Sequence, residues 1–269
     1  MTKNSAIGVF DSGIGGLTVV KSIIECMPQE NIIYFGDTAH VPYGTRSRRQ
    51  IRQYVLGDVK FLNTFDIKAV VIACNTADSV ARQAVEEAYP ELPIFGVVDP
   101  ASRLAAMATR NGKIGVIATK ATVESGAYDK AIANYNAEAE VISAACPLLV
   151  PLVENGRFET GDQVVELVLK EYLDPLAEQG IDTLVLGCTH YPLLQEAIEG
   201  LYPELNVISS SDAAAAKLLG TLIREKLCND EPGSERKYFV SDDAEGVDKL
   251  AHVFLQEELG GTFRQVDVE

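Results

Sequence analysis

The feature that most constrains the fold of this chain is an internal repeat built around two cysteines. Residues 67–92 read IKAVVIACNTADSVARQAVEEAYPEL, and residues 181–205 read IDTLVLGCTHYPLLQEAIEGLYPEL. Each copy runs from an apolar strand through a cysteine and a segment of helical pattern to YPEL. A strand that begins with IGV precedes each copy, at Ile7 and at Ile114. The repeat therefore predicts two related halves that face each other across a cleft.

Strand and helix patterns alternate along the whole chain, which is typical of an α/β protein with mostly parallel sheets. Short apolar runs predict strands at 7–12, 31–38, 69–76, 114–120, 139–146, 182–189 and 237–242. The clearest helical patterns cover 17–27, 78–89 and about 244–259. We therefore expect two pseudo-symmetric domains, each a mostly parallel sheet flanked by helices, with the active site between them.

The repeat also indicates where the two halves divide. The first half is expected to end near residue 98, before the second IGV strand. The last sixty residues are expected to pack back on the first half. The predicted domains are therefore 1–98 together with 210–269, and 99–209.

Composition argues against several classes of protein. The formal net charge is −16, whereas binding to nucleic acid normally requires a basic surface. No apolar run approaches the ~20 residues that span a membrane. The N-terminal residues lack the basic-then-apolar pattern of a secretory signal. We expect a cytoplasmic protein that binds neither nucleic acid nor membranes.

The chain has five widely spaced cysteines and no Cys-x-x-Cys motif. This pattern argues against a disulfide framework and against a structural zinc site, so reduced thiols are expected and no metal. Cys26, Cys146 and Cys228 are interpreted as ordinary small apolar residues. Cys74 and Cys188 differ from them because they occupy matching positions in the repeat.

Cys74 and Cys188 each fall where a strand ends and a helix is expected to begin. In open parallel sheets, ligands bind beyond the carboxyl ends of the strands. A helix N-terminus lowers the pKa of a thiol and offers amide N–H groups to a carboxylate. Polar side chains that can add hydrogen bonds follow both cysteines: Asn75, Thr76, Thr189 and His190.

Two thiols that face each other across a cleft suit the inversion of a stereocentre. One base removes the α-proton while an acid on the opposite face delivers another, whereas a single base tends to return the proton to the same face. Thiols exchange protons near working pH. Amides and hydroxyls at the helix starts relieve the negative charge that develops on the substrate carboxylate. The pattern therefore predicts an amino-acid racemase.

Two carboxylates and a histidine are further candidates for the site. Asp11 ends a strand before a glycine-rich turn, and Glu154 follows the apolar run LLVPLV, where a charge is less expected. Both can also be read as solvated loop carboxylates. His190 can equally be read as a cap for a helix that starts at Pro192. The two remaining histidines, His40 and His252, are interpreted as surface residues.

The glycine-rich turn DSGIGG (11–16) suggests phosphate binding at first sight. A dinucleotide fingerprint would need a third glycine at position 18, which is Thr18, and the Gly-Lys-Ser/Thr of a P-loop is absent. We interpret the glycines as letting backbone amides approach a small ligand.

With these residues in view, the chain resembles the glutamate racemases of the cofactor-independent aspartate/glutamate racemase superfamily. The matching segments are IGVFDSGIGGLTV (7–19), YFGDTAHVPYGTRS (34–47), VVIACNTA (70–77), KIGVIAT (113–119), CPLLVPLVENG (146–156) and LVLGCTHYPLL (184–194). They span most of the chain, although the part past about residue 215 is only weakly diagnostic. One departure is His40, where many members carry arginine or asparagine.

The resemblance implies interconversion of L- and D-glutamate without pyridoxal phosphate or metal, supply of D-glutamate for peptidoglycan, and homodimers. It assigns acid/base roles to Cys74 and Cys188. Asp11 would assist Cys74 and contact the substrate ammonium, while Glu154 and His190 would assist Cys188. Substrate contacts are implied for Asp11, Ser12, Tyr43, Gly44, Asn75, Thr76, Thr189 and His190.

Three alternatives remain open on the sequence. The first is a racemase of the same superfamily that acts on aspartate or another amino acid, because loop and pocket shape set the substrate length. The second is a binding module without catalysis, whose expected mark would be the loss of one thiol. The third is a nucleotide-binding enzyme, which the missing fingerprint disfavours.

Overall fold

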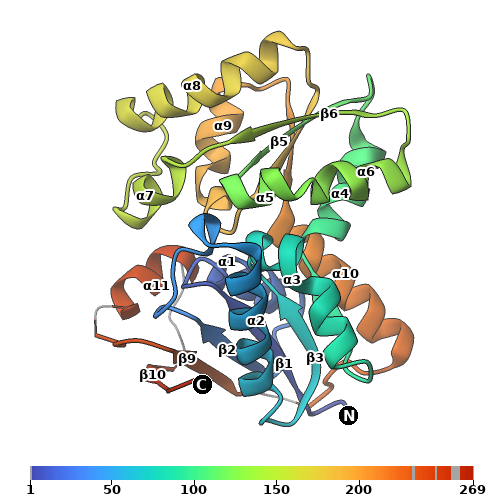
Figure 1. Ribbon diagram of the computed structural model, residues 1–269, viewed down its shortest axis with the longest axis vertical. Helices are drawn as coiled ribbons and strands as arrows, with labels where there is room; N and C mark the ends of the chain where they lie inside the picture. The colour runs from blue at the N-terminus through green and yellow to red at the C-terminus, as the bar shows by residue number, and fades with distance from the viewer. Residues whose placement is uncertain (1, 232–233, 246, 256–260, 269) are drawn as a thin grey trace.

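The chain folds into two α/β lobes, seen one above the other in Figure 1. A computed structural model describes residues 2–231, 234–245, 247–255 and 261–268. Within these ranges every strand pair is parallel. The predicted fold class, parallel sheets flanked by helices, is therefore confirmed.

The larger sheet has the strand order β10-β9-β2-β1-β3-β4 in the described part of the chain. Its strands are β1 (Ala6–Asp11), β2 (Ile32–Gly36), β3 (Ile67–Ile72), β4 (Ile94–Gly96), β9 (Arg236–Val240) and β10 (Phe263–Gln265). Because β9 pairs with β2, a segment from near the end of the chain extends the sheet that the beginning of the chain forms.

The smaller sheet repeats the topology of the larger one. Its order is β6-β5-β7-β8, for β5 (Lys113–Ala118), β6 (Glu140–Ala145), β7 (Thr183–Gly187) and β8 (Asn206–Ser209). The larger sheet contains the matching run β2-β1-β3-β4. Each IGV strand therefore lies beside the strand that leads to a repeat cysteine, which is the pseudo-symmetry that the repeat predicts.

Helices flank both sheets (Figure 1). The lower lobe in that view carries α1 (Leu17–Cys26), the short turn η1 (Tyr43–Thr45), α2 (Arg48–Leu62), α3 (Asn75–Ala88), α10 (Ser210–Glu225) and α11 (Val247–Leu255). The upper lobe carries α4 (Val98–Ala108), α5 (Lys120–Ser125), α6 (Ala127–Tyr135), α7 (Leu149–Glu154), α8 (Gln163–Glu178), η2 (Tyr191–Leu194) and α9 (Gln195–Leu201).

Several helices begin at capping residues that the sequence provides. Ser47 and Gln50 form a reciprocal capping box at the start of α2, and Asp162 accepts backbone N–H groups at the start of α8. Ser209 caps α10 in the same way. These caps satisfy amide groups that lack partners within the helix.

Each predicted strand is present, with ends that differ by up to a few residues. The strand predicted over 69–76 ends at Ile72, because Asn75 already belongs to α3. Sequence analysis missed the short strands β4, β8 and β10, since three or four residues carry little periodic signal. The helix predicted over 244–259 is observed as α11, and residues 256–259 lie outside the described residues.

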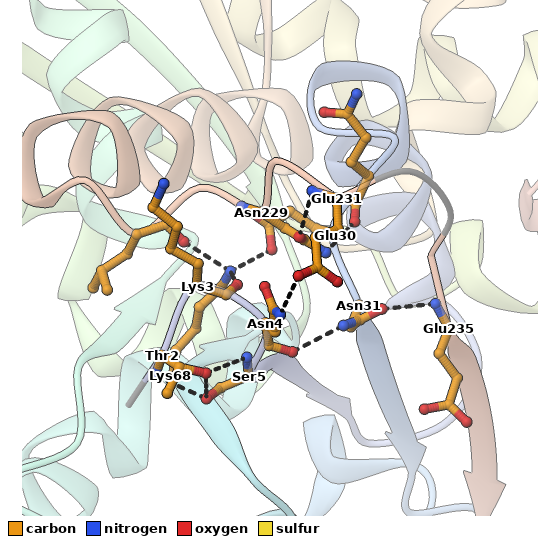
Figure 2. Close-up of polar contacts among 12 residues, drawn as sticks. Thr2, Lys3, Asn4, Ser5, Glu30, Asn31, Lys68, Asn229, Glu231 and Glu235 are labelled. Carbon is orange, nitrogen blue, oxygen red and sulfur yellow. Dashed lines mark hydrogen bonds and ion pairs between the residues drawn. The ribbon is translucent and has the colours of Figure 1, made fainter.

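A buried ion pair joins four segments at the end of the larger sheet that lies away from the other lobe (Figure 2). Lys68 Nζ lies 2.5 Å from Glu30 Oε2, and neither side chain is more than 2% exposed. The ammonium also donates to the carbonyl oxygens of Lys3 and Leu227. Glu30 Oε1 accepts the backbone N–H of Asn229. The pair therefore holds the N-terminal segment and the segment after α10 against the sheet.

Removal of the Lys68 charge is expected to destabilise the fold strongly. In Lys68→Met the Glu30 carboxylate stays buried without its partner, which costs about 3–5 kcal/mol. The matched control is Lys237→Met, which breaks a pair whose side chains are 41% and 68% exposed. That change is expected to cost less than about 1 kcal/mol. Urea denaturation measures both, and similar losses in the two variants would contradict the expectation.

Candidate active site

The two lobes meet at the residues that follow β1, β3, β5 and β7. On one side, the Thr76 hydroxyl lies 2.9 Å from the Thr119 hydroxyl of the other lobe. On the other side, the Thr18 hydroxyl donates to the carbonyl oxygen of Thr189 at 3.0 Å. The residues after the central strands of both sheets thus form one boundary, as expected for ligand sites in open parallel sheets.

Cys74 lies at the start of α3 and acts as the cap of that helix. Its Sγ accepts the backbone N–H of Ala77 at 3.5 Å, and its thiol donates to Ser12 Oγ at 3.4 Å. The side chain is 6% exposed. Ser12 directly follows β1, so the thiol lies between the ends of the two central strands of the larger sheet.

Asp11 ends β1 with its carboxyl group buried, at 1% exposure. Its Oδ2 accepts the backbone N–H of Gly13 at 3.0 Å. Its other oxygen, Oδ1, has no hydrogen-bond partner among the described residues. Burial raises the pKa of Asp11, while the nearby charge of His190 lowers it. The carboxyl therefore has one oxygen available to a donor from a ligand.

Cys188, His190 and Glu154 form a chain of contacts in the other lobe. His190 Nδ1 lies 3.8 Å from Cys188 Sγ, and His190 Nε2 lies 3.1 Å from Glu154 Oε1. Burial lowers the pKa of His190, but its contacts with Cys188 and Glu154 outweigh burial and raise that pKa to about 10. His190 is therefore an imidazolium at neutral pH, beside the sulfur of Cys188.

The charged neighbour of Cys74 is a carboxyl, Asp11, whereas that of Cys188 is the imidazolium of His190. Burial and the charge of Asp11 raise the pKa of Cys74 to about 12, even though contacts with Ser12 and Ala77 lower it. The amide of Ala77 at the helix N-terminus does lower the pKa of this thiol, as expected, but burial and the neighbouring carboxylate outweigh it, so the net shift is upward. The charge of Cys188 also contributes to the rise, so the two sulfurs act on each other across the boundary.

Asn75 and Thr76 both reach toward the other lobe. Asn75 Oδ1 accepts the hydroxyl of Tyr128 at 2.6 Å, and its Nδ2 lies 3.3 Å from Ser210 Oγ. Thr76 Oγ1 lies 3.2 Å from Thr122 Oγ1. These contacts bring the start of α3 against α5 and α6.

Two predicted site residues, Tyr43 and Gly44, lie in the turn η1. Gly44 faces the other lobe, since a Cβ atom there would lie 3.2 Å from Thr119 Cβ. Tyr43 is only 1% exposed, and its hydroxyl lies within hydrogen-bond distance of Asp37 and Asp58 inside its own lobe. The side chain of Tyr43 is therefore directed into its own lobe and away from the boundary.

Comparison with known proteins places this arrangement in a family. The sequence profile of the Asp/Glu/Hydantoin racemase family matches residues 7–218, which is most of the chain. The chain belongs to this family. It is therefore an amino-acid racemase, a kind of isomerase.

Individual relatives of this racemase cover nearly its whole length. The glutamate racemase of Geobacter metallireducens is 46% identical over 98% of this chain and 97% of its own. The glutamate racemase of Francisella tularensis, solved in complex with D-glutamate, has a TM-score of 0.92 at 38% identity, covering 99% of each chain. That of Thermus thermophilus, in complex with β-chloro-D-alanine, has a TM-score of 0.89 at 40% identity, covering 100% of this chain and 99% of its own.

None of the helices in the described ranges is long and apolar enough to cross a membrane. In the same part of the chain, no three His, Cys, Asp or Glu side chains are grouped so that they could hold a metal ion. All five cysteines are free thiols.

Sequence reasoning missed two hydroxyls that the racemase brings to the boundary, Thr119 and Thr122. Thr119 directly follows the second IGV strand, as Ser12 directly follows the first, so the two residues occupy equivalent places. Extending the repeat to the ends of the IGV strands would have identified Thr119. Thr122 lies within α5 and does not follow a strand, so only its contacts with Thr76 and Thr119 in the folded protein identify it.

A substitution at Gly15 is expected to disrupt the racemase site without a change in charge. A Cβ atom there would lie 2.5 Å from His190 Cε1 and 2.6 Å from Thr189 Oγ1, both across the boundary. Gly15→Ala must push these groups away, and a shift of about 1 Å can cost roughly 100-fold in rate. We therefore expect kcat/KM to fall about 100-fold.

The matched control for Gly15→Ala is Gly220→Ala in α10, where an added Cβ meets nothing within 4 Å. This variant is expected to keep its activity and to gain up to about 1 kcal/mol in stability from helix propensity. Steady-state kinetics and thermal unfolding of both variants make the comparison. Equal activity of the two alanine variants would contradict the assigned contact.

Proposed function

We propose that this racemase interconverts L- and D-glutamate by proton transfer between Cys74 and Cys188, without a cofactor. The observation that carries the proposal is the placement of the two thiols. Each follows the equivalent strand of one of two matching sheets, and the ends of those strands meet at one boundary. A substrate held between the lobes would have one sulfur on each face of its α-carbon.

The substrate groups find suitable partners at this boundary. The unpartnered Oδ1 of Asp11 suits the ammonium group. The hydroxyls of Thr76, Thr119 and Thr189, together with amides at the start of α3, suit the α-carboxylate. Such donors stabilise the negative charge that spreads onto the carboxylate when the α-proton leaves.

The electrostatic difference between the thiols suggests their starting states. The imidazolium of His190 stabilises a negative charge on Cys188, and Glu154 orients and supports that imidazolium. Cys74, with a pKa raised to about 12, starts as a thiol. Cys188 then removes the α-proton while Cys74 delivers its own proton to the opposite face. The protonation states of the two sulfurs are exchanged at the end, which sets the enzyme for the reverse reaction.

Glutamate is the proposed substrate because the relative that is 46% identical over 98% of this chain is a glutamate racemase, and the Francisella tularensis glutamate racemase, at 38% identity, was solved with D-glutamate. Aspartate or another amino acid is the alternative, since the shape of the pocket sets substrate length. Loss of a thiol, the mark of a non-catalytic binding module, is not seen at either position.

The wider role proposed follows from the family resemblance. D-glutamate would be supplied in the cytoplasm for peptidoglycan, and so for the cell wall and cell shape. The five free thiols suit a reducing compartment. We also propose a homodimer, and domains that comprise 1–98 with 210–269, and 99–209.

Purified protein with no added cofactor is expected to racemise glutamate faster than aspartate or alanine, with uptake of deuterium at the α-carbon in heavy water. Cys74→Ser and Cys188→Ser are each expected to lower the rate of inversion at least 1,000-fold, because a hydroxyl is a far weaker acid than a thiol and its conjugate base is not populated near neutral pH. Cys26→Ser is the control, since Cys26 is exposed and distant in sequence from both repeat copies. Circular dichroism detection of both enantiomers makes the measurement. Full turnover by either site variant would remove that thiol from the mechanism.

The charge state of His190 gives a second test. Because its pKa is raised to about 10, its ring is expected to stay protonated through pH 8 and to titrate near pH 10. Nitrogen NMR shifts of the imidazole ring, assigned by comparison with His190→Asn, report this directly. Glu154→Gln is expected to lower the midpoint, since it removes one of the groups that raise it. A midpoint near the ordinary value of about 6.5 would contradict the proposed starting state.

A further inference from the structure

Asp58 is a carboxyl group placed among apolar side chains. It lies on the buried stripe of α2 with Ile51, Val55, Val59 and Leu62. Its exposure is 1%. An ionised carboxylate is costly at such a position unless it is paired and hydrogen-bonded. Asp58 has no part in the proton transfer proposed above, so its burial needs a separate explanation.

The contacts of Tyr43 restrict the protonation state of Asp58. The Tyr43 hydroxyl lies 2.5 Å from Asp37 Oδ2 and 3.0 Å from Asp58 Oδ2, and both contacts are buried. A phenol hydroxyl has one proton, which it can donate to only one of the two carboxyls. The other carboxyl must itself carry a proton and donate it to the phenol oxygen, or else its oxygen faces the phenol oxygen without a hydrogen.

Asp37 is the carboxyl with further hydrogen-bonding partners besides Tyr43. It accepts the Ser241 hydroxyl on Oδ1 at 2.7 Å, and His40 Nδ1 lies 2.9 Å from both of its oxygens. These donors stabilise a negative charge on Asp37. Burial and the charge of Asp37 both raise the pKa of Asp58, although the contact with Tyr43 lowers it. The proton therefore lies on Asp58.

This chain of hydrogen bonds is attached to the turn at the cleft. Tyr43 begins η1, and the next residue, Gly44, lies against Thr119 of the other lobe. Thr119 is in turn bonded to Thr76 at the start of α3. The orientation of the Tyr43 ring thus fixes the backbone that faces the substrate region.

We propose that protonated Asp58 is a positioning residue, which donates to Tyr43 while Tyr43 donates to Asp37, and so holds the turn Tyr43–Thr45 at the cleft. The role in catalysis rests on the proposed racemase site, whereas the protonation state stands on the buried contacts alone. The titratable groups that face Asp58 are Tyr43 and Asp37, with Asp11 of β1 as a further charge nearby.

The test compares Asp58→Asn with Asp58→Ala. The amide of asparagine keeps a donor to Tyr43, as a protonated carboxyl does, whereas alanine removes it. Asp58→Asn is expected to keep KM within about threefold of the parent value. Asp58→Ala is expected to raise KM at least tenfold with a smaller change in kcat, because the turn contacts substrate and makes no proton transfer. Equal kinetic defects in both variants would overturn the positioning role.

A second measurement does not depend on activity. Above about pH 4 the unfolded chain has lost the Asp58 proton that the folded parent protein keeps, so the stability of the parent falls as pH rises. Asp58→Asn lacks this titrating proton. The ratio of its unfolding constant to that of the parent is therefore expected to fall as pH rises above about 4, by up to about tenfold per pH unit while folded Asp58 keeps its proton. Urea denaturation of the parent and of Asp58→Asn measures this ratio. The test does not use Asp58→Ala, so it remains possible even if that variant does not fold.

A ratio that stays constant with pH would mean that folded Asp58 is ionised, and would overturn the inference. Because this readout uses no substrate, it separates the two proposals. The protein could fail to racemise glutamate while the ratio still changes with pH as expected. That result would support a protonated Asp58 and contradict the proposed substrate. Asp129→Asn serves as the matched control, since a change at this exposed carboxyl is not expected to produce this dependence.

Discussion

The architecture depends on the contact between the ends of two matching sets of parallel strands. A proton can be removed from one face of a carbon and replaced on the other only if two groups approach from opposite sides. In this fold the same four-strand order occurs in both lobes, and the lobes meet at the carboxyl ends of the central strands. Duplication of one unit therefore supplies the two opposed positions that inversion requires.

Symmetry of the backbone does not extend to the electrostatics around the two thiols. Asp11 and burial favour the protonated form of Cys74, whereas the imidazolium of His190 lies beside Cys188. If both sulfurs started in the same protonation state, the pair would hold either two protons or none, and a transfer from one face to the other could not begin. If the two thiols transfer protons as proposed, the divergence of the two copies around a shared strand–cysteine–helix plan provides the unequal starting states that a two-base reaction needs.

The sequence predicts those features that depend on neighbouring residues along the chain better than those that depend on contacts between distant residues. The repeat predicts the paired sheets and the equivalent places of Cys74 and Cys188, because those features follow from the order of residues along the chain. The raised pKa of Cys74 could not be predicted in this way. It results from burial and from Asp11, which is 63 positions away in sequence, and the helix N-terminus gave the opposite expectation.

The short strands and the contacts of Tyr43 show the same limit. β4, β8 and β10 are too short for a periodic pattern, and their pairing with longer strands defines them. The motif around Tyr43 indicates a residue at the site, but the phenol points into its own lobe toward Asp37 and Asp58. Motif resemblance identifies the position of a residue, and only packing decides whether its side chain or its backbone meets the ligand.

Buried polar groups occur at both ends of the larger sheet, and they differ in how their charge is compensated. At the end away from the other lobe, Lys68 and Glu30 form an ion pair. The ammonium also donates to two backbone carbonyl oxygens, and the carboxylate also accepts a backbone N–H. At the cleft, Asp11 keeps one oxygen without a partner among the described residues. A satisfied pair stabilises the fold, whereas an unsatisfied buried acceptor raises the free energy of the unliganded protein and is relieved when a donor binds. The same sheet thus has a buried ion pair where the chain must be held, and a buried carboxyl oxygen without a hydrogen-bond donor where the ligand ammonium is proposed to bind.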